Sequence, residues 1–150
     1  MLQPKIILVV DDDKDILQLY SILLTRAGYS VDTAENGADA IEKTKTRRFD
    51  LALVDIVLPD MQGTDLLTKI NGMNSKMRKI MVTGNATLDN AILALNLGAD
   101  AYLRKPVKTE VLLESIEAQL RIQREEMLMT QEKISEFIQG KKANFVDIVR

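Results

Sequence analysis

The chain alternates short apolar runs with longer amphipathic stretches, and this alternation restricts its fold more than any other feature. The apolar runs, which have the length and composition of strands, lie at 5–10, 30–34, 50–54, 79–82 and 101–103. The amphipathic stretches, which have helical spacing, lie at 14–27, 37–47, 64–74, 87–97 and from 109 onward. Strands that alternate with helices of ten or more residues form right-handed βαβ units and a parallel sheet.

The pattern within each run predicts its place in the sheet. The runs IILVV and LALV are apolar throughout, as expected of central strands that are covered on both faces. The run SVDTA alternates instead, which suits the edge of a sheet. The predicted fold is therefore α/β, a doubly wound, flavodoxin-like five-stranded parallel sheet in the order 2-1-3-4-5, with five helices of which the last is extended.

Composition excludes several classes of function. The 22 acidic and 20 basic side chains leave a net charge of -2, so there is no broad electrostatic reason to bind nucleic acid or an anionic membrane. No apolar run is long enough for a signal peptide or a membrane span, and a soluble, cytoplasmic protein is expected. Cysteine and histidine are both absent, so any chemistry must come from carboxylates, lysines, hydroxyls and the backbone.

Polar residues follow four of the five predicted strands. Asp11 and Asp12 follow the first strand, Asp55 the third and Thr83 the fourth, while the fifth leads to Lys105. In an open α/β sheet, ligands bind outside the carboxyl ends of the strands, where the winding reverses. We therefore expect the three aspartates to converge on one shallow pocket, with the threonine and the lysine closing its other side.

This combination of residues predicts phosphoryl chemistry. Two carboxylates about 4 Å apart repel by ~4 kcal/mol at an effective dielectric near 20, so the cluster must take up protons or bind a cation. Oxygen ligands without His or Cys favour Mg²⁺, which leaves a carboxylate as the nucleophile. Lys105 and Thr83 would then stabilise phosphoryl oxygens. Taken singly, an Asp after a strand is more often a helix cap, which is the role we expect of Asp13 or Asp15.

Four motifs carry a resemblance to a known family. KIILVVDDD, LALVDIVLPDMQG, KIMVTGNA and GADAYLRKP occur in this order within residues 4–122. The chain resembles the receiver domain of bacterial two-component response regulators. The resemblance implies a receiver domain at 1–122, followed by a C-terminal helical extension or linker at 123–150 without an effector domain.

The resemblance also implies roles for individual residues at the acceptor site. Asp55 would be the phosphoacceptor. Asp12 and Asp55 would bind Mg²⁺ through their side chains, Asp11 through water, and Val57 through its backbone carbonyl. In the family, the positions of Val57 and Asn85 tune the lifetime of the phosphorylated state. Because an apolar Val57 cannot orient an attacking water, we expect slow to moderate hydrolysis.

Further roles follow from the resemblance at the other side of the site. Thr83 and Lys105 would bind the phosphoryl oxygens, and Tyr102 would be the switch aromatic, turning inward when Thr83 moves. The Lys105–Pro106 bond is expected to be cis. The phosphodonor would be a sensor histidine kinase, a phosphotransfer protein or a small molecule. The face formed by the fourth helix, fifth strand and fifth helix would control a downstream protein partner or dimerisation.

The C-terminal extension carries half of a coiled-coil pattern. One seam recurs every seven residues and is apolar, and the second is half polar. The two seams are Leu113, Leu120, Met127 and Ile134, and Ile116, Gln123, Thr130 and Phe137. Helix-mediated dimerisation, packing on the chain's own domain and a linker toward a partner all stay open. Gly140 is expected to end the helix.

Three other functions compete with a phosphoacceptor switch. A phosphatase resembling the haloacid dehalogenase superfamily would use Asp11 as nucleophile and Asp13 as acid/base, but it leaves Asp55 unexplained and lacks a further acidic pair. A calcium loop starting at Asp11 fails because isoleucine stands at its sixth and twelfth positions, Ile16 and Ile22. A scaffold that keeps the fold without phosphorylation is the third, although every side chain required for phosphorylation is present.

Overall fold

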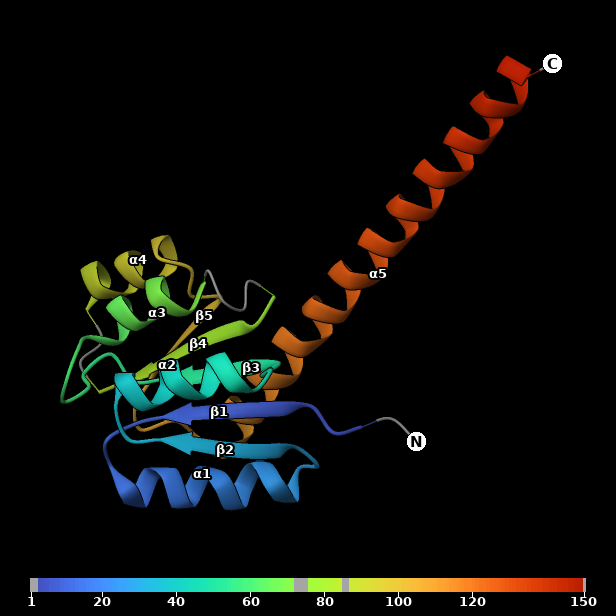
Figure 1. Ribbon diagram of the computed structural model, residues 1–150. Helices are drawn as coiled ribbons and strands as arrows, with labels where there is room; N and C mark the ends of the chain where they lie inside the picture. The colour runs from blue at the N-terminus through green and yellow to red at the C-terminus, as the bar shows by residue number, and fades with distance from the viewer. Residues whose placement is uncertain (1–2, 72–75, 85–86, 150) are drawn as a thin grey trace.

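The structure is a computed structural model that describes residues 3–71, 76–84 and 87–149 (Figure 1). The strands are β1 (Ile6–Val10), β2 (Ser30–Ala34), β3 (Leu51–Val54), β4 (Arg78–Thr83) and β5 (Ala101–Arg104). The helices are α1 (Lys14–Arg26), α2 (Gly37–Thr46), α3 (Gly63–Asn71), α4 (Leu88–Asn96) and α5 (Thr109–Val149). All strand pairs are parallel and the order is β2-β1-β3-β4-β5, which confirms the predicted doubly wound fold. The end of the third predicted helix, 72–74, lies outside the described residues.

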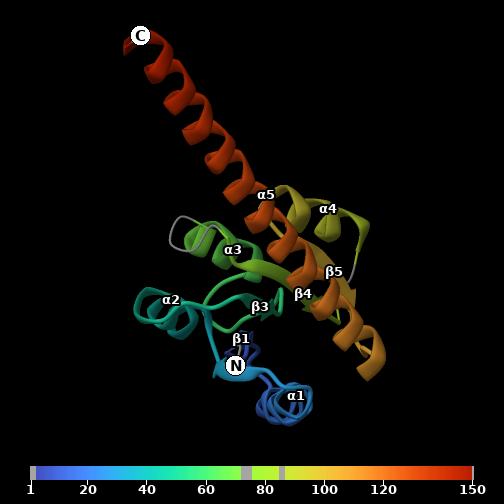
Figure 2. The ribbon, with the colours of Figure 1, turned by 90° about the vertical axis from the view of Figure 1, so that its right-hand side faces the viewer.

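Helices cover both faces of the sheet (Figure 2). Alternate residues of the central strands point to opposite sides, so Ile7 and Val9 pack with α1 and α5, whereas Leu8 and Val10 pack with α2, α3 and α4. Every residue of β3 is buried, while β2 is half-buried at the edge. The central and edge positions predicted for these strands are therefore confirmed.

Side chains and glycines at the helix ends set where the helices begin and stop. The Asp13 carboxylate caps α1 by accepting two backbone N–H groups of its first turn, and the Thr87 hydroxyl caps α4. Gly28 and Gly98 adopt positive φ angles of 99° and 108° just beyond α1 and α4, a conformation that side chains disfavour. The two caps thus begin α1 and α4 just beyond the carboxyl ends of β1 and β4, and the two glycines end these helices before β2 and β5.

Helix α5 is longer than the sequence indicated. It runs without interruption from Thr109 to Val149, so the expectation that Gly140 ends it is wrong. A glycine inside a helix costs roughly 1 kcal/mol relative to alanine but does not forbid helical angles, and among the described glycines only Gly28 and Gly98 have positive φ. The part of α5 beyond the sheet extends away from the rest of the chain (Figures 1 and 2). None of the helices that the structure describes has the length and apolarity needed to cross a membrane.

A polar cluster, which we call the α5 clamp, fixes α5 at the amino ends of β4 and β5. Its members are Arg78, Asp100, Gln119, Gln123 and Glu126. Arg78 donates from Nε to Gln119 Oε1 (3.0 Å) and forms ion pairs with Asp100 (3.3 Å) and Glu126 (3.5 Å). Gln123, only 4% exposed, donates to the carbonyl oxygens of residues 50 and 76, both at 2.9 Å. The helix is therefore tied to the sheet as far as residue 126.

The seven-residue repeat of α5 divides into two parts at this clamp. Its first part contacts the chain's own sheet, since Ile116, Leu120 and Gln123 are all buried there. Beyond Met127, which is half-buried, its second part is open to solvent, and among the side chains that the structure describes there the exposed large apolar ones are Leu128, Met129, Ile134, Phe137 and Ile138. Packing on the chain's own domain thus accounts for the repeat up to Gln123 and in part at Met127.

Candidate functional site: a carboxylate cluster at the carboxyl end of the sheet

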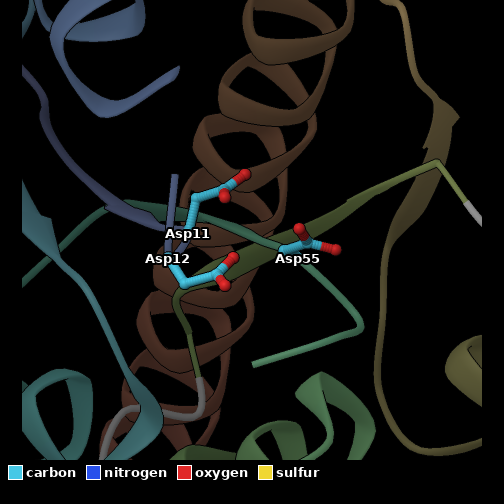
Figure 3. A group of neighbouring side chains, drawn as sticks. All are labelled: Asp11, Asp12 and Asp55. Atoms are coloured by element: carbon cyan, nitrogen blue, oxygen red, sulfur yellow. The ribbon is translucent and has the colours of Figure 1, made fainter. Parts of the chain in front are cut away.

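The backbone brings the predicted aspartates together. Since β1 and β3 are neighbours, the residues that follow them are adjacent, and Asp55 N donates to the Val10 carbonyl (3.0 Å). One carboxylate oxygen from each of Asp11, Asp12 and Asp55 lies within 4.8 Å of the other two. Figure 3 shows the three side chains gathered beyond the ends of these strands. The predicted convergence of these three residues is present in the structure.

The two carboxylates nearest the sheet have fixed orientations. Asp11 and Asp55 are 3% and 9% exposed, whereas Asp12 is exposed to solvent. In each buried carboxylate, Oδ1 accepts the backbone N–H two residues further along, at 2.9 Å from Asp13 N and 3.2 Å from Val57 N. These hydrogen bonds hold the side chains so that each Oδ2 remains available to a further partner.

Lys105 is that partner for both carboxylates. Its Nζ lies 2.7 Å from Asp11 Oδ2 and 3.0 Å from Asp55 Oδ2. Burial on its own would lower the pKa of the Lys105 ammonium, but the hydrogen bonds that it donates to the two carboxylates, together with their negative charge, outweigh burial and raise that pKa above its usual value. The lysine is therefore a charged counter-ion between two acidic groups that would otherwise repel each other. The following bond to Pro106 is cis, as predicted.

Of the remaining predicted residues, Thr83 and Tyr102 lie on β4 and β5, and Val57 lies in the loop after β3. Thr83, 1% exposed, ends β4, and its carbonyl accepts the backbone N–H of Lys105 (2.8 Å). Tyr102 lies on β5 in register with Met81 and is half-buried. Burial raises the pKa of its hydroxyl, and this hydroxyl forms no hydrogen bond with any of the described residues. Val57 is 50% exposed beside the cluster. Asn85 lies outside the described residues.

The segment 56–62, which we call the acceptor loop, leaves the cluster and returns to it. Leu58 N donates to the Met61 carbonyl (3.2 Å), and Gly63 N donates to the Ile56 carbonyl (2.5 Å). A Cβ on Gly63 would lie 2.9 Å from Ile56 Cα and closer still to the Asp55 carbonyl oxygen. Only glycine therefore allows α3 to begin directly against the backbone of Asp55.

Sequence reasoning missed Asp60, an exposed residue of the acceptor loop. Its carboxylate accepts the backbone N–H groups of Gly37 (to Oδ1, 2.8 Å) and Ala38 (to Oδ2, 2.9 Å) in the first turn of α2. These hydrogen bonds hold the pKa of Asp60 below its usual value. The two partners lie more than 20 residues earlier in the chain. No local pattern could have revealed the contact.

The donor set of the cluster fits a hard divalent cation. All its ligand atoms are carboxylate oxygens, and the chain has no histidine or cysteine that would favour a softer metal. The third aspartate of the first motif, Asp13, is not part of the cluster, because its carboxylate caps α1. The acid/base role that a phosphatase would require of Asp13 therefore has no support in the structure.

Comparison with known sequences finds one family model and several curated relatives that match most of the chain. The family model for the response regulator receiver domain matches residues 7–117. The probable transcriptional regulatory protein TcrX of Mycobacterium tuberculosis is 33% identical over 119 residues, which are 79% of this chain and 51% of TcrX. The transcriptional regulatory protein CusR of Escherichia coli is 35% identical over 115 residues, 77% of this chain and 51% of CusR. The chain thus spans about half the length of these curated relatives.

Solved structures agree in fold. A CheY-like response regulator receiver domain protein from Methanospirillum hungatei is 46% identical with a TM-score of 0.80, covering 82% of this chain and 98% of that one. A response regulator protein from Burkholderia pseudomallei, solved with a phosphorylated aspartic acid, a calcium ion and citrate, is 30% identical with a TM-score of 0.73. That match covers 83% of this chain and 74% of that one.

Proposed function

Because the chain belongs to the response regulator receiver domain family, we propose that it is a phosphoacceptor signalling switch whose acceptor is Asp55. The observation that carries this proposal is the position of the Asp55 carboxylate. It lies 3.0 Å from Lys105 Nζ and within 4.8 Å of oxygens of Asp11 and Asp12. A nucleophilic oxygen, a mobile cationic side chain and acidic cation ligands therefore share one small region at the end of the sheet.

The transfer step would require these residues, a divalent cation and a phosphodonor. An Asp55 carboxylate oxygen forms a bond to phosphorus, while the bond from phosphorus to the donor breaks and its electron pair leaves with the donor. The donor would be a phosphohistidine of a sensor kinase or phosphotransfer protein, or a small molecule such as acetyl phosphate. Asp11, Asp12, Asp55 and the Val57 carbonyl would hold Mg²⁺, which supplies positive charge to offset the charge of the phosphoryl group.

Lys105 and Thr83 would bind the transferred group. The Lys105 ammonium already contacts Asp55 Oδ2, so a small shift moves its charge from carboxylate to phosphoryl oxygen. Thr83 ends β4, and its hydroxyl would donate a hydrogen bond to a phosphoryl oxygen. We expect Tyr102 to move with Thr83, because its buried hydroxyl has no described hydrogen-bond partner that would hold it. Val57, which offers no polar group to an attacking water, is expected to make hydrolysis slow to moderate.

Phosphorylation in vitro tests the proposed acceptor. We expect acetyl phosphate with Mg²⁺ to add the mass of one phosphoryl group to the intact protein, and chelation of Mg²⁺ to prevent it. Asp55→Asn is nearly isosteric but lacks the nucleophilic oxygen, so it should take up none. Failure of the native chain to gain mass would favour a scaffold without phosphorylation. Full uptake by Asp55→Asn would instead favour a different nucleophile such as Asp11.

The output is proposed to be a protein partner or a second copy of the chain, without direct binding of nucleic acid. Two surfaces offer apolar groups to such a partner. One is the face of α4, β5 and α5, where Ile92, Leu95 and Val111 are 48%, 51% and 43% exposed. The other is the extension of α5 beyond the clamp, where Ile134 and Phe137 are 55% and 65% exposed.

A further inference from the structure

Asp60 connects the acceptor loop, which follows Asp55, to the start of α2. Its two carboxylate oxygens accept separate N–H groups at the start of α2, at 2.8 Å from Gly37 N and 2.9 Å from Ala38 N. A carboxylate at a helix N-terminus is favoured both by these unpaired N–H groups and by the helix dipole. Paired hydrogen bonds to one carboxylate also fix its direction. The contact is therefore specific and joins the acceptor loop to α2.

The packing beside Asp60 is tight. A Cβ on Gly37 would lie within 2.7 Å of three atoms of the Met61 side chain, so the loop lies directly against the start of α2. On the other side, β2 leads into α2, and the Ala34 carbonyl at the end of β2 accepts the backbone N–H of Asp11 (3.1 Å). Asp11 is thus linked to the acceptor loop by a hydrogen bond to Ala34, the backbone from Ala34 to Gly37, and the hydrogen bond from Gly37 to Asp60.

Within the acceptor loop, the base and the tip are held differently. Ile56 and Leu58 are buried at 4% and 5% exposure, which anchors the base of the loop to the core. Val57 lies between them with its side chain half exposed. Beyond Leu58, Pro59 and Asp60 are exposed. The Asp60 carboxylate ties this exposed part to α2 by hydrogen bonds.

We propose that Asp60 is a positioning residue for the divalent cation, and that it holds the acceptor loop against α2 so that the Val57 carbonyl can reach a cation bound by the carboxylate cluster. This inference rests on the proposed function, because it assumes that the cluster and Val57 bind Mg²⁺. It goes further by assigning the orientation of the loop to a side chain that touches neither the cation nor the phosphoryl group. Residues that orient metal ligands in this indirect way typically change metal affinity by about 10- to 100-fold when removed.

Three variants separate positioning from charge and from helix stability. Asp60→Ala removes both hydrogen bonds. Asp60→Asn removes the same charge but keeps a carbonyl oxygen that can accept one of the two N–H groups. Asn36→Ala is the matched control, because the Asn36 side chain caps the same helix by accepting Asp39 N (2.8 Å) and forms no hydrogen bond with the described residues of the acceptor loop. The dissociation constant for Mg²⁺ is measured for each by titration of backbone amide NMR shifts, together with hydrogen exchange of the Gly37 and Ala38 amides.

We expect Asp60→Ala to bind Mg²⁺ about tenfold more weakly than the native chain and to exchange the two amide protons faster. Asp60→Asn should recover part of this loss, and Asn36→Ala should retain native affinity. Equal Mg²⁺ affinity of Asp60→Ala and the native chain would overturn this inference but not the proposed function. A loss of affinity in Asn36→Ala or in Asp60→Asn as large as that in Asp60→Ala would overturn it in the same way. Absence of Mg²⁺ binding by the native chain would overturn the inference together with the proposed cation site.

Discussion

At the scale of single residues, the charge of Lys105 is balanced against two acidic groups at once. Its ammonium bridges Asp11 and Asp55, and both of these carboxylates are nearly buried. A buried carboxylate that loses its counter-charge is costly, because water cannot replace the lost partner. The same lysine therefore has a structural role in addition to its proposed role in binding the phosphoryl group.

Replacing Lys105 by methionine should expose this structural role. Loss of the ammonium is expected to lower the free energy of unfolding by about 1–3 kcal/mol at neutral pH, because Asp11 and Asp55 are left to repel each other. Mg²⁺ should then stabilise the variant more than the native chain, since a cation relieves the same repulsion. Urea unfolding with and without Mg²⁺ measures both effects. Equal stabilisation of the two proteins by Mg²⁺ would contradict this account.

A methyl group at Gly63 should disturb the acceptor directly. Its Cβ would lie 2.9 Å from both the Asp55 carbonyl carbon and Ile56 Cα, so the backbone of the acceptor must shift. We expect Gly63→Ala to destabilise the protein by about 1–3 kcal/mol and to slow phosphoryl uptake. Gly140→Ala is the matched control. It lies in α5 with nothing within 4 Å of the added methyl, and it should stabilise by about 0.5–1 kcal/mol.

At the scale of elements, an ion pair protects the exposed edge of the sheet. Asp32 on β2 receives a hydrogen bond from Lys43 Nζ of α2 (3.0 Å) and lies 3.6 Å from Arg47. Partial burial on its own would raise the pKa of Asp32, but these cations and the Thr33 N–H together lower it. The charged side chains also make the edge strand a poor template for pairing with another chain.

The lowered pKa of Asp32 predicts a pH-dependent contribution to stability. A folded-state pKa below the unfolded value means that the interaction stabilises the protein above the unfolded pKa of about 4 and is lost as pH falls through the lower folded value. Asp32→Asn should therefore be less stable than the native chain at pH 7, and the difference should shrink below about pH 4. Urea unfolding at several pH values measures it. A difference that does not change with pH would contradict the assignment.

The α5 clamp should set how firmly the extension is held. Gln123→Ala removes the two hydrogen bonds to the carbonyls of residues 50 and 76, just before β3 and β4, at a cost of about 1–2 kcal/mol in the free energy of unfolding. Hydrogen exchange in α5 should become faster from residue 119 onward. Gln131→Ala, an exposed position on the same helix, should leave exchange at residues 119–126 unchanged. Native protection in Gln123→Ala would mean that apolar packing alone holds the helix.

The fold and the cluster could be predicted because their signals are local. Strand and helix periodicity fix the topology, and Asp11, Asp55 and Thr83 each stand directly beyond an apolar run. The contacts of Asp60 and of the α5 clamp could not be predicted, because their partners are set by how distant segments pack. The wrong prediction that α5 ends at Gly140 has a different cause. A glycine serves as a C-cap by adopting positive φ, and the residue type alone does not show whether it will do so.

At the scale of the whole molecule, the proposed input and the extension lie at opposite ends of the sheet. The carboxylate cluster follows the carboxyl ends of the strands, whereas the α5 clamp joins residues at the amino ends of β4 and β5. A partner bound to the extension would therefore leave the acceptor accessible to a phosphodonor. The extension is thus a suitable place to bind a partner while Asp55 is being phosphorylated.

Dimerisation through the extension can be separated from dimerisation through the α4–β5–α5 face. We expect a beryllofluoride mimic of the phosphoryl group to increase the molecular mass in solution, measured by light scattering after size exclusion. If the extension is the interface, Ile134→Glu should abolish this increase, whereas Met129→Glu, about 140° away around the helix, should not. Ile92→Glu tests the other face in the same way. An unchanged monomer in the native chain would point to a different protein as the partner.

The continuity of α5 has a consequence for any partner that contacts its far end. Because one unbroken helix joins the sheet to residue 149, the direction in which its far end presents side chains is set by the number of residues after the α5 clamp. Each residue inserted or deleted there turns the distal surface by about 100° and moves it by about 1.5 Å along the axis. Relatives with extensions of different length would therefore present their distal surfaces at different azimuths, and seven residues, close to two turns, would nearly restore the original one.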